Sequence, residues 1–170
     1  APEPWVLGSS ADSVGFAADL GLPYCIADFI AAQQGDLADA YRARFVPRHA
    51  GDRPRVMVAV WTVCAQTDAA AQRLAAPARM MFAHMMMGKS IAVPDPDVAV
   101  AWLADRPEVA RGFASRRVVA GSLATVRAGL LEVISEYQAD ELMLVNILHG
   151  HDDRKASYQL SFDAMQLVDA

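Results

Sequence analysis

The sequence predicts an α/β fold in which four short apolar strands alternate with helices along a parallel sheet. Three observations support this prediction. Each of four apolar runs is followed by a polar turn and then by a segment with helical spacing. The composition is 54% hydrophobic and 21% charged, which is richer in apolar residues than an antiparallel sheet with one wetted face. At 170 residues, the chain can bury a sizeable core as a single domain, 1–170.

The first two β/α units are short. The apolar run WVLG at residues 5–8 leads into the polar turn SSADS at 9–13, and apolar residues then recur at helical spacing until Gly21. A second apolar run at 24–27 is followed by a helix predicted at about 36–45, which Pro47 closes.

The third unit carries a long insertion. Residues 56–64 are almost continuously apolar and predict a buried strand, and the Thr67-Asp68 pair predicts the start of a helix that ends near Met86. From 87 to 115 the regular pattern fails, and the sequence predicts an irregular, lid-like insertion with one short helix at about 98–103. The residues that interrupt the pattern are Gly88, Pro94, Pro96 and Pro107.

Regularity returns for the fourth unit, with a helix that follows Ser122 and ends at Tyr137, a strand at 141–145 and a closing helix at about 154–167. Alternation of strand and helix implies right-handed βαβ crossovers and a parallel sheet. Periodicity alone leaves two architectures open, a small doubly wound domain and part of a closed barrel.

Charge and composition exclude several partners. The formal net charge of -5 provides no broad basic field for nucleic acid or an anionic membrane. No apolar run reaches the roughly 18 residues that cross a bilayer, and the N-terminus has no signal-peptide pattern. Cys25 and Cys64 lie inside apolar runs, which favours buried thiols in a reducing compartment. We therefore expect a cytoplasmic protein.

Three segments carry a family resemblance. PWVLGSSADSVGFAADLGLPY resembles the fifth strand and helix of the luciferase-like, flavin-dependent monooxygenases, including their Gly-Leu-Pro helix end. RVMVAVWTVCAQTDAAAQRLA is similar to the seventh strand and the helix start after it, and VVAGSLATVRAGLLEVISEYQADELML resembles the closing loop, helix and eighth strand. Together they resemble the bacterial luciferase or alkanal monooxygenase type. Further residues at family positions are His151, Arg154, Ser157 and Tyr158.

The resemblance implies the second half of a TIM (β/α) barrel. It implies an oxidoreductase flavoprotein that uses reduced FMN as co-substrate and transfers oxygen from O2 to an aldehyde or other apolar substrate. The family's first four β/α units, which supply the catalytic histidine and basic residues for the flavin phosphate, have no counterpart in this chain. The start at Ala1 without Met agrees with a cut between elements. We therefore assign no catalytic residue and expect turnover only in a complete barrel.

Candidate cofactor-binding residues follow the first two strands, because the loops after the strands form the functional face of a parallel barrel. Ser9, Ser10 and Ser13 can bind a phosphate through hydroxyl and amide groups at a helix start, and the resemblance places the flavin phosphate against Ser10 and Ser13. The competing interpretation is a plain helix cap by Ser10 or Asp12. Asp28 is a candidate for the border of the flavin ring, or a loop cap.

Other polar clusters give weaker signals. Gly121-Ser122 is a second candidate anion site, although a plain cap is the favoured interpretation. His149 and His151 alternate in a loop without the i, i+4 spacing of a helical metal site, and His84 lies among methionines that suit an apolar core or substrate channel. The sequence therefore predicts no metal site.

Two classes of function remain open. The first is an FMN-dependent monooxygenase, and the alternative is a non-catalytic half-barrel that serves as a flavin-binding or assembly module. Four β/α units leave two open sheet edges, and open edges pair readily with other strands. We therefore expect a homo-oligomer, or pairing with a partner chain that supplies the missing half.

Overall fold

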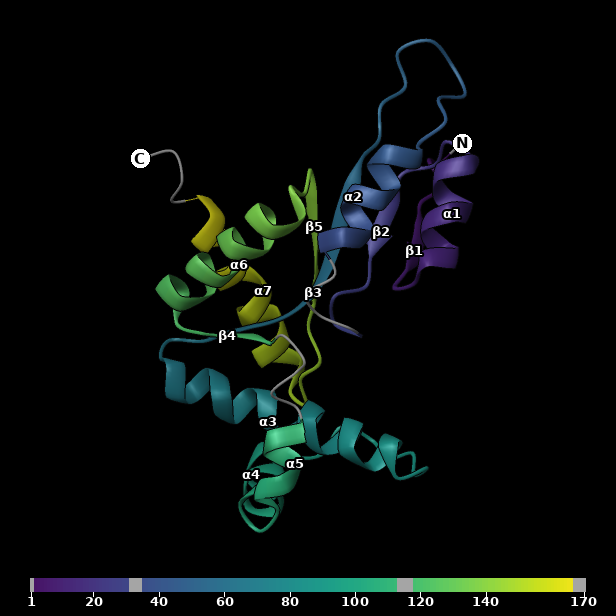
Figure 1. Cartoon of the computed structure of the whole chain (residues 1–170). Helices are drawn as coiled ribbons and strands as arrows, with labels where there is room; N and C mark the ends of the chain where they lie inside the picture. Colours follow the sequence, from purple (N-terminus) through teal and green to yellow (C-terminus); the bar gives the residue numbers. More distant parts are fainter. Residues whose placement is uncertain (1, 31–34, 113–117, 167–170) are drawn as a thin grey trace. The chain divides into compact units, whose positions relative to one another are not determined.

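A computed structural model describes residues 2–30, 35–112 and 118–166 of the chain (Figure 1). The chain divides into two compact units. Unit 1 contains the residues up to Val60 together with Leu130–Leu144, and unit 2 contains Trp61–Gly129 together with the residues from Val145 onward. The elements follow one another as β1 (Val6–Gly8), α1 (Ala11–Asp19), β2 (Tyr24–Ile26), α2 (Gly35–Arg44), β3 (Val56–Cys64), α3 (Asp68–Met86), α4 (Pro96–Ala104), α5 (Pro107–Gly112), β4 (Val119–Gly121), α6 (Leu123–Tyr137), β5 (Glu141–Val145) and α7 (His151–Gln166).

The sheet is built from parallel pairs, as the alternating pattern predicts. β1 pairs with β2 in the register Gly8↔Ile26, and β2 pairs with the first residues of β3. The last residues of β3 pair in parallel with β4, in the register Cys64↔Gly121. β5 also pairs with β3. The predicted α/β class with a parallel sheet is confirmed.

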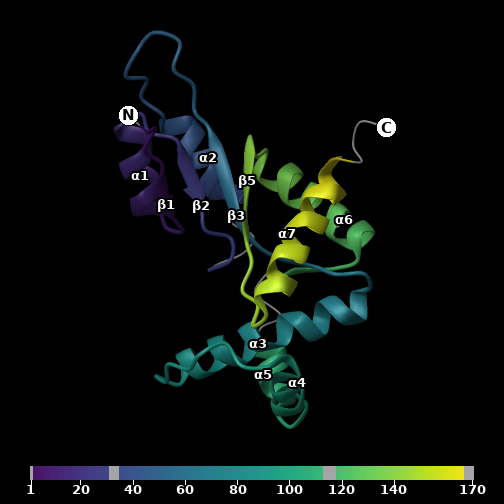
Figure 2. The same ribbon diagram turned by 180° about the vertical axis from the view of Figure 1, so that it is seen from behind.

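In unit 1 two helices cover the strands. α1 contacts β1 and β2, and α2 contacts both α1 and β2, an arrangement that can be followed from either side in Figures 1 and 2. Burying apolar strand residues under such helices removes them from water, which is the main stabilising contribution. Large, fully buried side chains of this core include Tyr24, Tyr41, Tyr137, Ile26, Leu130 and Val56.

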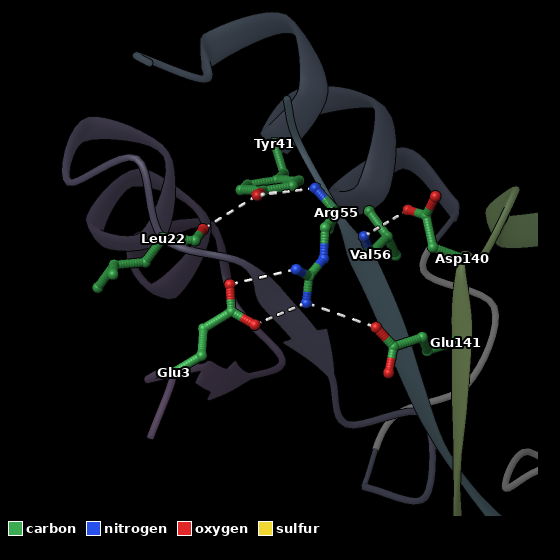
Figure 3. A network of polar contacts seen from close by, with 7 residues as sticks. All are labelled: Glu3, Leu22, Tyr41, Arg55, Val56, Asp140 and Glu141. Carbon is green, nitrogen blue, oxygen red and sulfur yellow. Dashed lines mark hydrogen bonds and ion pairs between the residues drawn. The ribbon is translucent and has the colours of Figure 1, made fainter. Parts of the chain in front are cut away.

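A polar network joins the amino ends of the strands in unit 1 (Figure 3). The Arg55 guanidinium donates to both carboxylate oxygens of Glu3, at 3.2 and 2.9 Å, and lies 3.5 Å from a carboxylate oxygen of Glu141. The Asp140 carboxylate accepts from the backbone N–H of Val56 at 2.9 Å. Charge-assisted contacts of this kind fix geometry well, so the network sets where β1, β3 and β5 begin.

Tyr41 lies at the buried end of the same network. Its hydroxyl donates to the Leu22 carbonyl oxygen at 2.9 Å and accepts from the Arg55 backbone N–H at 3.3 Å. The side chain is fully buried, and this burial raises the pKa of the phenol above its ordinary value. The hydroxyl therefore satisfies two backbone groups that would otherwise be buried without partners.

In unit 2 the helices of the insertion pack on one another, with α4 against α3, as Figures 1 and 2 both show. Thr67 caps α3, since its side chain accepts from the Ala70 backbone N–H at 3.2 Å. The helix ends in a left-handed glycine, Gly88, with φ 72°, whose N–H donates to the Met85 carbonyl. The predicted helix start at Thr67-Asp68 and its end near Met86 are confirmed.

The insertion leaves and rejoins the sheet at one place. The backbone N–H of Ala65, directly after β3, donates to the carbonyl of Gly121 at the end of β4, and the Asp68 carboxylate accepts from the Ser122 N–H at 2.6 Å. Helices α3, α4 and α5 all fall between these two points. The whole excursion therefore starts and ends at the carboxyl end of β3, which is the ligand-binding edge of parallel sheets.

The structure differs from the sequence-based expectations in its short elements. Strand β4 was not expected, because three residues are too few to show alternation. Helix α5 lies inside the segment 87–115 that we predicted as irregular beyond one short helix, and α7 begins at His151 rather than near Arg154. Residues 113–115 of that segment and Leu167 of the predicted closing helix lie outside the described residues. Within the described part of the chain, no helix has the length and apolarity needed to cross a membrane.

Replacement of Tyr41 by Phe tests the network. Y41F leaves the Leu22 carbonyl and the Arg55 N–H without their shared partner in a buried place, so we expect the free energy of unfolding to fall by about 1–3 kcal/mol. E3Q is the matched control, since Glu3 is half exposed and its ion pair should contribute less than about 1 kcal/mol. Urea unfolding measures both, and equal losses would contradict the importance of the buried hydroxyl.

Replacement of Gly21 by Ala tests the turn after α1. Gly21 has φ 57°, and an added Cβ would collide with the Val46 carbonyl oxygen. Gly51 has φ 95° but nothing near its would-be Cβ, so G51A carries backbone strain of about 1–3 kcal/mol alone. We expect G21A to lower the free energy of unfolding more than G51A does. A smaller loss in G21A, measured by thermal or urea unfolding, would show that the turn can relax.

Candidate functional site

Ser10 and Ser13 together form the start of α1. Ser10 is the N-cap residue in an extended conformation, and its side chain accepts from the Ser13 backbone N–H at 3.4 Å. The Ser13 hydroxyl lies 3.2 Å from the Ser10 backbone nitrogen and 2.7 Å from the Ser10 carbonyl oxygen. The two serines thus form a reciprocal capping box. The cap interpretation from the sequence therefore describes the geometry of Ser10.

Ser13 also connects the helix start to the strands. Its hydroxyl lies 2.9 Å from the hydroxyl of Tyr24, which is buried in β2. Burial is the main cause that raises the pKa of Tyr24, so the phenol stays protonated and can donate. A Cβ on Gly8 would collide with the Ser13 side chain. Only glycine at the end of β1 therefore lets Ser13 approach the strand.

Asp28 is placed at the same edge of unit 1. Since Gly8 pairs with Ile26, the turns that follow β1 and β2 leave the sheet side by side. The Ala27 N–H donates to the Gly8 carbonyl at 2.9 Å, which holds the two turns together. The structure thus brings Ser9, Ser10, Ser13 and Asp28 to one edge.

Asp28 is completely buried and accepts a hydrogen bond of 2.6 Å from the Tyr137 hydroxyl. Tyr137 is the last residue of α6 and is itself buried. A buried carboxylate is costly unless hydrogen bonds compensate it, so this contact fixes both side chains. Sequence reasoning missed Tyr24 and Tyr137, because their apolar surroundings made them indistinguishable from core residues.

In unit 2 the second candidate anion site is already filled by an acid. The Asp68 carboxylate accepts from the Ser122 N–H, and hydrogen bonds from Ser122 and Thr125 hold the pKa of Asp68 below its ordinary value. A carboxylate at this position compensates the positive end of the α6 dipole. The sequence-based interpretation was a plain cap by Ser122, whereas the carboxylate of Asp68 occupies this helix start. A second anion would therefore be repelled.

Ser157 has a structural role in unit 2. Its buried hydroxyl accepts from the Cys64 backbone N–H at 2.9 Å and from the Asn146 side chain at 2.7 Å. At the surface, His151 and Arg154 contact each other at 2.8 Å across the start of α7. His149 lies 2.8 Å from the Val93 carbonyl and so connects the loop after β5 to the insertion.

The methionine-rich end of α3 borders a cavity of about 320 Å³ in unit 2. His84 contacts the Met80 carbonyl at 2.9 Å and faces the Trp102 ring at 4.9 Å between centroids. Among the residues that the structure describes, no three His, Cys, Asp or Glu side chains gather as a metal-ligand set. The residues that line the cavity are Met81, Met85, Gly88, Lys89, Ser90 and Ile91.

Known proteins with similar sequences support the α/β arrangement described above. Residues 1–140 match the family model for luciferase-like monooxygenases. The chain is 33% identical over 167 residues to the uncharacterized protein YwcH of Bacillus subtilis, a match that covers 96% of this chain and 50% of that protein.

Solved structures share the fold. The chain is similar to apo-MsnO8 with a TM-score of 0.89 and 38% identity, over 99% of this chain and 52% of that one. It also resembles the oxygenating constituent of the 3,6-diketocamphane monooxygenase from the CAM plasmid of Pseudomonas putida, solved with FMN. That likeness has a TM-score of 0.61 and 19% identity, and covers 96% of this chain and 47% of that one.

The lengths of these proteins bear on what the chain can do alone. The chain spans about half the length of the relatives that it matches. Its α/β architecture with a parallel sheet corresponds to about half of a luciferase-like barrel. On the match over residues 1–140, the chain belongs to the luciferase-like monooxygenase family.

Proposed function

We propose that this chain is the flavin-phosphate-binding half of an FMN-dependent monooxygenase that oxidises an aldehyde or other apolar substrate with O2. The proposal rests on the serine edge, defined as Ser9, Ser10 and Ser13 at the start of α1. When bound, reduced FMN supplies the oxygen chemistry. The residues of this chain bind and orient the cofactor. The chain forms the second half of the barrel, and the first four β/α units complete it.

The serine edge has the donor set that a phosphate needs. Hydroxyl groups and backbone amides at a helix start bind phosphate oxygens, and the helix dipole favours negative charge there. The Ser13 side chain lies against Gly8, in space that a larger residue would fill. Asp12 adds a negative charge in the first turn, but it is exposed and can turn to solvent. The residues present therefore fit a phosphate.

We further propose that Asp28 and Tyr137 border the flavin ring. The pair lies at the same edge as the serines and is held by a hydrogen bond of 2.6 Å. Because both side chains are completely buried, their part in this proposal is to hold the turn after β2, against which the ring would lie, in a fixed place. In this proposal the two residues are positioning groups, and the catalytic residues belong to the missing half.

A cytoplasmic location is part of the same proposal. Cys25 and Cys64 are both buried free thiols. Burial raises the pKa of Cys25 to about 11, so this thiol stays protonated and unreactive, as suits a protein in a reducing compartment.

A second candidate function is a half-barrel assembly module without activity of its own. The observation that favours it is the edge of β1, which pairs only with β2 among the described strands and exposes Leu7. An open edge can accept another strand. In this case a second copy, or a partner chain with the other four units, completes the barrel.

The phosphate assignment predicts a selective loss. Replacing Ser10 and Ser13 by Ala removes hydroxyls that contact a charged group, so we expect FMN affinity to fall about 10-fold or more, at roughly 1.5–3 kcal/mol per such hydrogen bond. Riboflavin lacks the phosphate, and its affinity should stay nearly constant. Fluorescence titration of the intact protein with both flavins measures the ratio.

The matched control for this experiment is T67A. Thr67 caps α3 as Ser10 caps α1, so T67A costs a similar amount of helix stability, about 1 kcal/mol, without touching the serine edge. We expect T67A to bind FMN as the unchanged protein does. Equal loss for FMN and riboflavin in the serine variant would reduce its effect to general destabilisation and defeat the phosphate assignment.

The assembly hypothesis predicts a mass above that of a single chain. Light scattering on the protein as it elutes from a size-exclusion column should give twice the chain mass if two copies complete a barrel. L7K should restore a monomer, because a charged side chain on an edge strand opposes edge-to-edge pairing. L20K is the control, since Leu20 is also exposed but follows helix α1. A colourless dimer that takes up no added FMN would favour the assembly module over the monooxygenase.

A further inference from the structure

Helix α3 carries two arginines in opposite environments. Arg73 is half exposed and donates to the Asp97 carboxylate at 2.7 Å, which raises its pKa. Arg79 lies two turns further along the helix, where burial lowers its pKa. A guanidinium stays charged at all ordinary pH values, so Arg79 holds a positive charge in a partly desolvated place.

Arg79 has no acidic partner in the described part of the chain. Its hydrogen bond there goes to a neutral group, the Gln72 side-chain oxygen, at 2.7 Å. The Asp97 carboxylate, which contacts the same helix, is already bound by Arg73. Of the acidic residues in the sequence, Asp169 alone falls outside the described residues. A partly buried charge without a counter-ion is unfavourable, and an anion that reaches it removes this cost.

Gln72 holds the guanidinium at a defined place. While its oxygen accepts from Arg79, its amide nitrogen donates to the Ala120 carbonyl of β4 at 3.0 Å. The chain of contacts therefore runs from β4 through Gln72 to Arg79. A guanidinium fixed through one nitrogen keeps further N–H donors, whose fork matches the two oxygens of a carboxylate.

Arg79 belongs to the insertion that begins at the carboxyl end of β3 in unit 2. The insertion that contains α3 starts after Cys64 and returns at Gly121, both at the carboxyl end of the parallel strands. Ligands of parallel α/β folds bind at this end. Arg73 has an ordinary surface role on the same helix, so the helix by itself does not account for the environment of Arg79.

We propose that Arg79 is an oxyanion-recognition residue that binds the carboxylate of an organic substrate, with Gln72 as its positioning partner. As a statement about substrate, the proposal rests on the proposed function and narrows it, since the apolar substrate then carries a carboxylate at one end. As a statement about binding, it requires neither flavin nor turnover.

The test is direct binding to the intact protein. Octanoate is titrated while the side-chain Nε–Hε signals of the arginines are followed by NMR, and inorganic phosphate is titrated separately. We expect a saturable shift of the Arg79 signal with octanoate, and an affinity at least 10-fold lower in R79Q. R79K keeps the charge but loses the fork, so its affinity should fall between the two.

The matched control is R73Q, which removes an arginine of the same helix that is already paired. R73Q should bind octanoate as the unchanged protein does, and Q72A should weaken binding because it releases the Arg79 guanidinium. A saturable shift with phosphate but none with octanoate would contradict the carboxylate proposal and show that Arg79 binds phosphate instead. No shift with either anion, or equal loss in R73Q and R79Q, would overturn the proposal.

FMN titration of R79Q separates this inference from the proposed function. R79Q should bind FMN with unchanged affinity if the flavin phosphate is held by Ser10 and Ser13. Loss of octanoate binding with intact FMN binding supports both statements. Intact octanoate binding in R79Q contradicts the inference about Arg79 and leaves the serine edge unaffected.

Discussion

The parallel register of β1 with β2 is the constraint on which the candidate site depends. Because Gly8 lies opposite Ile26, the turns that follow the two strands leave the sheet at the same edge and in contact, with the Ala27 N–H bonded to the Gly8 carbonyl. A slip by one residue would turn Tyr24 out of the core and separate its hydroxyl from Ser13. The register thus determines the core and the serine edge together.

The two ends of the strands in unit 1 have different tasks. At the amino ends, Arg55 and Tyr41 use ion pairs and a buried hydroxyl to hold the strand starts in place. At the carboxyl ends, the side chains of Ser10, Ser13 and Asp28 gather around open turns. This division is typical of parallel β/α architectures, in which different residues provide stability and function. It lets residues at the carboxyl ends of the strands change without loss of the core.

In unit 2, the role of a polar side chain becomes clear only when its hydrogen-bond partners are known. Ser122 directly follows β4, yet Asp68 occupies the helix start there. Ser157 lies in α7, and its hydroxyl accepts from the backbone N–H of Cys64. Arg79 has the reverse character. Its sequence context is an alanine-rich helix without any motif, but its hydrogen-bond partner is the neutral Gln72 amide, and no acid among the described residues pairs with it.

The sequence by itself determined the order of the long elements, since periodicity follows from which side chains must face the core. It located β3, α3 and α6, and the resemblance of the serine turn pointed to Ser10 and Ser13. Tertiary structure alone decided the contact of Tyr137 with Asp28, whose residues lie 109 positions apart. It also decided that Asp68 caps α6 and that, among the described residues, Arg79 is paired with the Gln72 amide and with no acid. Such contacts depend on how segments far apart in the sequence pack together, and the local sequence pattern does not reveal this packing.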